Sequence, residues 1–199
     1  MAAIRPLARA HFPTQTIALA RHLLGKIVVR ELRGTRLAGR IVETEAYLPD
    51  DPACHAFRGP TPRTRSLFLA PGHAYVYLCY GTSYLLNVSS EAPGIGAGVL
   101  LRALEPLEGL ARMRRVRGRC RDIDLSRGPG RLAAALSVDR RFDGIDLLAG
   151  RTLWLGEDGH EIGPIGQSVR IGLTKAADVR LRFFLAGSRY LSGPPHVNA

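Results

Sequence analysis

The segment Gly39-Arg40-Ile41-Val42-Glu43-Thr44-Glu45-Ala46-Tyr47 combines strand-forming residues with two closely spaced carboxylates. Its Ile, Val, Thr and Tyr favour extended backbone, so residues 36–47 are expected to form a strand. Residues 26–32 form an earlier apolar strand, and the tight turn Arg33-Gly34-Thr35 joins the two strands into a hairpin. Because strand side chains alternate with a period of two, one face is expected to carry Ile41, Glu43, Glu45 and Tyr47.

Outward from this hairpin, strands are mixed with a few helices. Thr14 or Thr16 can cap a helix that ends at Gly25. Further helices are expected from Pro106 through Arg114 and from Pro129 through Leu136. The expected strands are 74–78 and 84–89, which form a second hairpin, then 98–104, 152–155, 168–173 and 180–185.

The chain has no linker or internal repeat that would divide it. We therefore expect one α+β domain over residues 1–199, a mixed domain on an antiparallel sheet with flanking helices. The ends, residues 1–13 and 193–199, are expected to be loosely ordered.

The composition limits the class of protein. The 199 residues are 46% hydrophobic and carry 28 Lys+Arg against 17 Asp+Glu, a net charge of +11. This excludes a disordered chain, and no apolar run approaches the roughly 20 residues that span a bilayer. The first residues lack the apolar core of a signal peptide. A basic globular domain favours nucleic acid as its partner.

The three cysteines show no C-x-x-C spacing. This favours a reducing compartment and argues against a structural zinc site.

Glu43 and Glu45 are the candidate acid–base groups. Both lie between the apolar residues Ile41 and Tyr47, and removal from water would make one carboxylate a better base near neutral pH. The alternative is a solvent-facing strand whose glutamates pair with arginines, and the motif alone favours that alternative. Arg102, which follows an apolar strand, is expected to pair with a carboxylate or a phosphate.

A group of tyrosines marks the second hairpin. Tyr80 stands beside Gly81 at its expected tip, where an aromatic ring is exposed unless it has a partner, and nucleic-acid bases stack on such rings. Tyr75 and Tyr84 are expected to be core residues. Asn87 on the return strand is unfavourable for a strand, so it either satisfies buried backbone groups or contacts a ligand.

Two basic segments follow. The arginines between Arg112 and Arg121 are expected to form a solvated surface, with residues 114–124 as a loop. The turn Gly128-Pro129-Gly130-Arg131 leads into a helix, and a glycine-rich helix N-terminus with an arginine in its first turn is typical of an anion site.

Taken together, these residues resemble the alkyladenine (3-methyladenine) DNA glycosylase family of the mammalian type. The resemblance runs in the family's order from about Leu19 to about Gly187. It rests on the strings Gly39 to Tyr47, Thr61-Pro62-Arg63, Pro71-Gly72, Tyr75-Val76-Tyr77, Tyr80-Gly81, Asn87-Val88-Ser89-Ser90, Leu100 to Leu110 and Gly128-Pro129.

The resemblance implies a curved antiparallel sheet and hydrolysis of the N-glycosidic bond of alkylated or deaminated purines in duplex DNA. It implies that Glu45 activates water, which Arg102 and the carbonyl of Ile171 help to hold. Tyr80 would enter the duplex in place of the flipped base. His55 would form a hydrogen bond with the flipped base, and Asn87 would exclude guanine. The residues that would line the base pocket are Tyr47, His55, Tyr77 and Asn87. The expected phosphate contacts are Arg63, Gly130 and Arg131.

The partner implied is double-stranded DNA with damaged purines, bound by a monomer in the bacterial cytoplasm or nucleoid, without membrane, cofactor or metal. The two lysines, Lys26 and Lys175, lie outside the glutamate and tyrosine motifs, so no Schiff-base lyase step is expected. Relative to mammalian members, the loop from Tyr47 to His55 is one residue shorter and Thr82 replaces Met, which leaves the lesion range open. The alternative is a non-catalytic basic nucleic-acid-binding or damage-binding protein.

Overall fold

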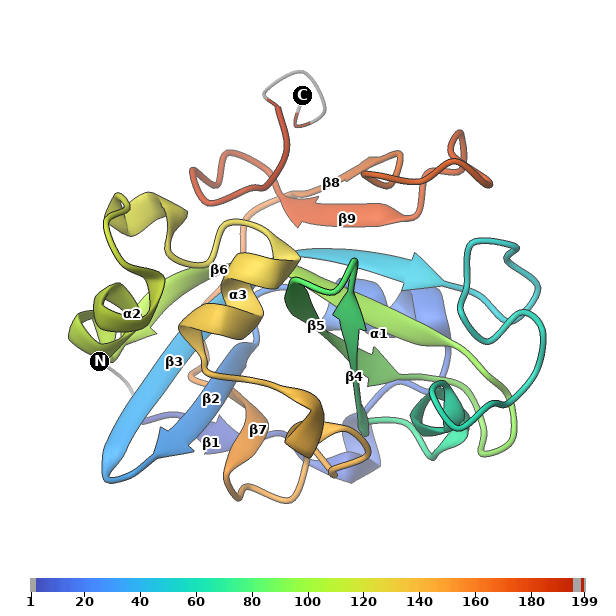
Figure 1. The fold of residues 1–199 in the computed structure, drawn as a ribbon, viewed down its shortest axis with the longest axis horizontal. Helices are drawn as coiled ribbons and strands as arrows, with labels where there is room; N and C mark the ends of the chain where they lie inside the picture. Colours follow the sequence, from blue (N-terminus) through green and yellow to red (C-terminus); the bar gives the residue numbers. More distant parts are fainter. Residues whose placement is uncertain (1–2, 195–197, 199) are drawn as a thin grey trace.

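The computed structural model describes residues 3–194 and residue 198. These residues form a single α+β domain with one open antiparallel sheet of nine strands and three α-helices (Figure 1). The strand order is β1-β7-β2-β3-β6-β5-β4; β9 pairs with β3 and β8 pairs with β9. The expected fold class is confirmed.

The strands are β1 (Arg5–Pro6), β2 (Ile27–Leu32), β3 (Thr35–Tyr47), β4 (Ala74–Cys79), β5 (Ser83–Ser89), β6 (Gly98–Glu108), β7 (Leu153–Glu157), β8 (Ile165–Ser168) and β9 (Arg182–Leu185). The α-helices are α1 (Thr16–His22), α2 (Leu110–Arg117) and α3 (Pro129–Ala135). Single 3-10 turns occur at η1 (Arg9–His11), η2 (Arg65–Phe68), η3 (Asp122–Asp124) and η4 (Arg140–Phe142). None of the helices among the described residues has the length and apolarity needed to cross a membrane.

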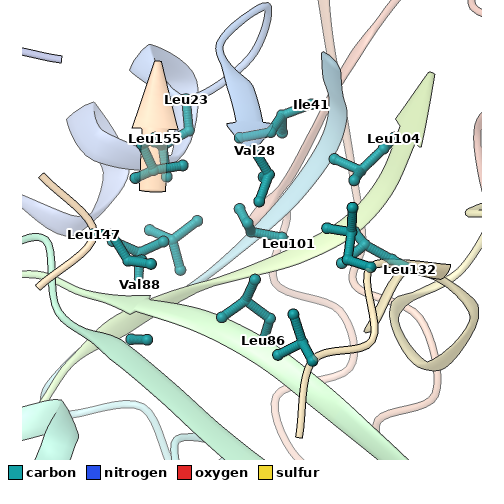
Figure 2. Close-up of a cluster of buried hydrophobic side chains, with 14 of the residues drawn as sticks. Leu23, Val28, Ile41, Leu86, Val88, Leu101, Leu104, Leu132, Leu147 and Leu155 are labelled. Atoms are coloured by element: carbon teal, nitrogen blue, oxygen red, sulfur yellow. The ribbon is translucent and has the colours of Figure 1, made fainter. Parts of the chain in front are cut away.

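The main core lies between one face of the sheet and the helices α1 and α3. Alternating apolar residues of the long strands meet apolar side chains from both helices, because each element must bury its apolar side against another element. Figure 2 shows this cluster, which includes Leu23, Val28, Ile41, Leu86, Val88, Leu101, Leu104, Leu132, Leu147 and Leu155.

The central strand β3 carries a bulge just before its first carboxylate. Ile41 pairs with Leu104 and Glu43 pairs with Ala103, so Val42 is an extra residue on β3. Two successive residues at a bulge can face the same side of a sheet. Ile41 packs in the main core, whereas the next two residues both face the other side: Val42 packs with Ala103 in a separate cluster, and Glu43 pairs with Arg102.

The neighbouring strand β6 carries a compensating irregularity at Arg102. Thr44 pairs with Leu101, two residues along β6 from Ala103, so Arg102 is the extra residue here. Leu101 and Leu104 both pack in the main core although they are three residues apart. Arg102 and Ala103 are therefore turned away from that core.

The two bulges decide which side of the sheet receives the charges. Glu43 and Glu45 are turned toward Arg102, whereas Ile41 and Ala46 lie in the main core. The expectation that Ile41 shares a face with the two glutamates is wrong, because a one-residue shift reverses the alternation of side chains.

Other differences from the expected elements have local causes. The strand β6 continues through Pro106 to Glu108, so the helix expected from Pro106 is absent. Pro106 lies opposite Gly39 at a register shift between β3 and β6. A proline, which has no backbone N–H, is tolerated at such an irregular position of a strand. Gly109 then adopts a φ of 77° before α2 begins. The strand expected at 168–173 lies at β8 instead.

The lead-in residues are more ordered than expected. The strand β1 pairs with β7, and Leu7 and Phe12 are buried. In the expected loose tail, residues 193–199, the described residues Gly193 and Pro194 are exposed and belong to no helix or strand. The expected loose ends at residues 1–2, 195–197 and 199 lie outside the described residues.

Candidate active site

Glu45 is fully buried on β3, and three neighbours hold its carboxylate. The backbone N–H of Ile171 donates to Oε1 at 2.8 Å, and Nη1 of Arg102 lies 3.1 Å from the same oxygen. The hydroxyl of Tyr47 donates to Oε2 at 2.8 Å. The side chain is neither solvent-facing nor a surface ion pair, so the alternative interpretation of the glutamate motif is wrong for Glu45.

Glu43 is the second buried carboxylate, and it lies between two buried arginines. Its Oε1 accepts from Nε of Arg102 at 3.0 Å and from Nε of Arg182 at 2.7 Å. Burial alone would raise the pKa of Glu43, but the two guanidiniums outweigh burial and the pKa is lowered. Burial would lower the pKa of Arg102, yet Glu45 and Glu43 raise it. The expected pairing of Arg102 with a carboxylate is confirmed.

A cavity of about 360 Å³ opens beside this cluster. Each residue that contacts the Glu45 carboxylate, namely Tyr47, Arg102 and Ile171, also lines the cavity. Glu45 therefore lies directly behind the cavity wall. The remaining lining residues are Ala53, Cys54, His55, Leu67, Tyr75, Tyr77, Cys79, Tyr80, Leu85, Asn87, Gly98, Leu100, Pro129, Gly172 and Leu173.

Aromatic rings form one wall of the cavity. The rings of Tyr75 and Tyr77 stack with centroids 5.2 Å apart, and the His55 ring meets Tyr77 edge-on at 4.6 Å. Nδ1 of His55 lies 3.0 Å from the Tyr75 hydroxyl. Burial, and then the charge of Arg63, lower the pKa of His55 and favour its neutral form. Tyr75, expected only as a core residue, is both buried and part of this wall.

Tyr80 lies at the tip of the β4–β5 hairpin on the cavity rim. Its side chain is 93% exposed, as expected. Its φ of 49° and the φ of 70° at Gly81 belong to the left-handed region, which costs energy for a tyrosine. A large exposed ring on a strained turn is the kind of feature that function, and not packing, explains.

Asn87 and the N-terminus of α3 also reach the cavity. Asn87 is buried, pairs across the sheet with Tyr75 and donates its amide to that residue's carbonyl at 3.2 Å. Pro129 lines the cavity beside the exposed Arg131. A Cβ on Gly130 would lie 2.9 Å from Cβ of Ser83, so this glycine also permits the close packing of α3 on β5.

Several site residues gave no signal in the sequence. Arg170 is buried, forms an ion pair with Asp51 and donates to the carbonyl of Ala46 at 3.0 Å, with its guanidinium over the Tyr47 ring at 4.7 Å. It thereby ties the loop after β3 to the loop that supplies Ile171. Arg182 and Ser192 around Glu43 were likewise missed, because only long-range folding brings them there.

The arginines of residues 112–121 do not reach the cavity lining. Those of residues 112–117 lie on or beside α2, not in a loop, and part of their charge is neutralised locally. Arg114 forms a bidentate pair with Asp122, and Arg121 pairs with Asp124. This agrees with the expectation of a solvated surface.

Comparison with known proteins agrees with a DNA-processing enzyme of the glycosylase class. The family model for methylpurine-DNA glycosylase matches residues 10–189, and the chain belongs to this family. A relative from Mesorhizobium japonicum is 61% identical over 95% of this chain and 91% of its own length. A relative from Paraburkholderia phytofirmans is 51% identical over 96% of this chain and 90% of its own length. A relative from Rubrobacter xylanophilus is 49% identical over 87% of this chain and 90% of its own length. All three carry the provisional name 3-methyladenine DNA glycosylase.

The protein is thus a DNA N-glycosylase of base excision repair, which acts on DNA that contains damaged bases. The family resemblance seen in the sequence is confirmed. The alternative of a non-catalytic nucleic-acid-binding protein is not supported.

Replacing Glu43 by Gln leaves two buried guanidiniums facing a neutral amide. We expect Glu43→Gln to lower the free energy of unfolding at pH 7 by roughly 3–5 kcal/mol, measured by urea denaturation. The pKa of Glu43 is lowered from its ordinary value of 4.5 in the folded protein. The stability difference is therefore present above about pH 4.5 and is lost as the pH falls through the lowered pKa.

The matched control is Glu31→Gln, because Glu31 is a half-exposed strand glutamate at the surface, paired with Arg36. Its loss should stay below about 1 kcal/mol. Equal losses for the two variants at pH 7 would contradict a special role for the Glu43 charge.

Proposed function

We propose that this glycosylase removes alkylated or deaminated purines from duplex DNA, the class of 3-methyladenine, 7-methylguanine, hypoxanthine and ethenoadenine. The lesion is flipped into the aromatic cavity, and water activated by Glu45 hydrolyses its N-glycosidic bond. The observation that carries this proposal is the fully buried Glu45, held by Tyr47, Arg102 and the Ile171 N–H directly behind the cavity wall.

Base flipping is required because a base inside a duplex cannot reach a recessed cavity. Flipping costs a few kcal/mol of lost stacking. The exposed Tyr80 ring stands on the rim, where it can enter the gap and stack on the neighbouring bases.

The cavity walls favour the cationic or electron-poor rings of damaged purines. The wall presents the aromatic rings of Tyr47, Tyr77 and His55, which can stack on a base and attract positive charge. Burial lowers the pKa of His55, so its ring adds no positive charge that would repel a cationic base. Asn87 is fixed by its bond to the Tyr75 carbonyl, so its side chain can crowd the 2-amino group of guanine. His55 supplies a ring nitrogen for hydrogen bonding to the base.

The chemistry needs one carboxylate and one water. The water oxygen attacks C1′ of the sugar while the electron pair of the C–N bond leaves with the purine. The proton of the water passes to Glu45, and the carboxylate also stabilises the oxocarbenium-like transition state. Arg102 and Ile171 both contact the Glu45 carboxylate, and in this proposal Arg102 and the carbonyl of Ile171 orient the water.

Phosphate contacts supply affinity that does not depend on sequence. The proposed contacts are Arg131 and the Gly130 backbone at the N-terminus of α3, together with Arg63. The guanidinium of Arg63 lies 5.2 Å from the ring centroid of the cavity residue Tyr77, so Arg63 would link the aromatic wall to the DNA backbone.

We further propose that the enzyme is monofunctional. A lyase step needs an amine nucleophile that is activated by desolvation or a nearby charge. Lys26 is paired with Glu157, and Lys175 is exposed to solvent two residues after the cavity residue Leu173. We propose that the enzyme acts on nucleoid DNA as a monomer.

Loss of the Glu45 charge should slow base release strongly and leave DNA binding intact. We expect Glu45→Gln to slow release of 3-methyladenine and hypoxanthine from a duplex by roughly 10²–10⁴-fold, the usual contribution of a general base. The measurement is single-turnover base release beside a titration of DNA affinity. Glu31→Gln should match the unchanged enzyme; release by Glu45→Gln at the normal rate would remove Glu45 from the mechanism.

The wedge role of Tyr80 predicts a defect in flipping. In Tyr80→Ala, the rise of 2-aminopurine fluorescence beside the lesion on enzyme binding should be strongly reduced, because no ring fills the gap. Tyr80→Phe keeps the ring and should preserve the signal. A full fluorescence rise with Tyr80→Ala would contradict the wedge.

Arg131→Ala should weaken the dependence of DNA affinity on salt. Removal of one phosphate contact lowers the slope of log affinity against log salt by roughly 0.9. The control is Arg36→Ala, another exposed arginine paired with a carboxylate, at the β2–β3 hairpin. An identical slope for Arg131→Ala and the unchanged protein would show that Arg131 touches no phosphate.

A further inference from the structure

Glu43 and Ser192 hold the buried guanidinium of Arg102 on the side away from Glu45. Its Nε donates to Glu43 at 3.0 Å and to Oγ of Ser192 at 3.2 Å, and its Nη2 donates to the same Oγ at 3.1 Å. The third nitrogen, Nη1, lies 3.1 Å from Oε1 of Glu45. The orientation of the planar group is therefore set from the side opposite to Glu45.

Ser192 uses its whole hydrogen-bonding capacity in this cluster. Its backbone N–H donates to Oε2 of Glu43 at 2.6 Å, and its hydroxyl donates to Oε1 at 2.8 Å. The hydroxyl oxygen accepts from Arg102, so one side chain bridges the carboxylate and the guanidinium. Only 4% of the residue is exposed.

The segment around Ser192 is anchored independently of the cluster. Leu191 packs with Val42 and Phe184, and its carbonyl accepts from Nε of Arg127 at 2.6 Å. Ser192 lies beyond residue 189, where the match to the family model ends. The tail of this chain thus contributes a group to the centre of the enzyme.

We propose that Ser192 is a positioning residue for base release. Its hydroxyl fixes Arg102 so that Nη1 faces Glu45 and the attacking water. Loss of the hydroxyl removes the acceptor of Nη2 and lets the guanidinium turn about the Cδ–Nε bond, away from Glu45. This inference rests on the proposed role of Glu45.

The cluster contains a matched control. Ser168 on β8 accepts from Nη1 of Arg182 at 2.8 Å, and Arg182 donates from Nε to the same Glu43 oxygen at 2.7 Å. Ser168→Ala therefore removes the same kind of hydroxyl–guanidinium bond from the same buried network. It does not touch Arg102.

The experiment measures single-turnover release of a purine lesion and DNA affinity for Ser192→Ala, Ser192→Thr and Ser168→Ala. We expect Ser192→Ala to slow release about tenfold, which matches the loss of a hydrogen bond to a charged group, with DNA affinity unchanged. Ser192→Thr keeps the hydroxyl and should restore most of the rate. Ser168→Ala should react at the normal rate.

Two results would overturn the proposal: normal release by Ser192→Ala, or an equal loss in Ser168→Ala, which would indicate general weakening of the network. Thermal denaturation of each variant identifies misfolding. If Ser192→Ala does not fold, Ser192→Cys is measured in its place, because its thiol has a similar size but is only a weak hydrogen-bonding group. The same slowing of base release is expected for Ser192→Cys. Release by Glu45→Gln at the normal rate would refute the proposed function itself. An inactive Glu45→Gln with a fully active Ser192→Ala would refute only the role of Ser192.

Discussion

The structure depends on burying two carboxylates and two guanidiniums beside one cavity. Charges removed from water are costly unless paired and fully hydrogen-bonded, and loss of one partner leaves the other uncompensated. Glu43 meets this requirement with contacts from Arg102, Arg182 and Ser192. The strand β9 and the C-terminal segment supply two of these partners, so distant parts of the chain are needed to hold the centre of the molecule together.

The same constraint explains the irregular pairing of β3 with β6. With regular alternation, Glu43 would face the apolar core that contains Ile41, away from Arg102. The bulges at Val42 and Arg102 turn the charges to the other face and return the ladder to register at Thr44. One pair of local defects thus allows a continuous apolar core on one side and a buried charged cluster beside the cavity on the other.

The cavity combines rigid and strained parts, which suits base removal. Tyr75 and Tyr77 of its aromatic wall lie on the strand β4, and Glu45 is held on β3 by fixed partners, so the proposed chemistry would need little reorganisation of the protein. Tyr80 lies on an exposed, strained turn, where its ring is available to the duplex. Family membership shows that this arrangement belongs to a DNA glycosylase.

The sequence alone determined the β2–β3 and β4–β5 hairpins, the exposure of Tyr80, the cavity residues of the family motifs and the glycosylase class. These follow from local strand propensity, turn chemistry and short motifs, which are readable along the chain. Only the tertiary structure decided that β6 continues through Pro106, that Ile41 lies opposite the glutamates, and that Ser192 and Arg182 meet Glu43. Bulge positions and buried ion partners are set by contacts between residues up to 139 positions apart, and such contacts leave no local pattern in the sequence.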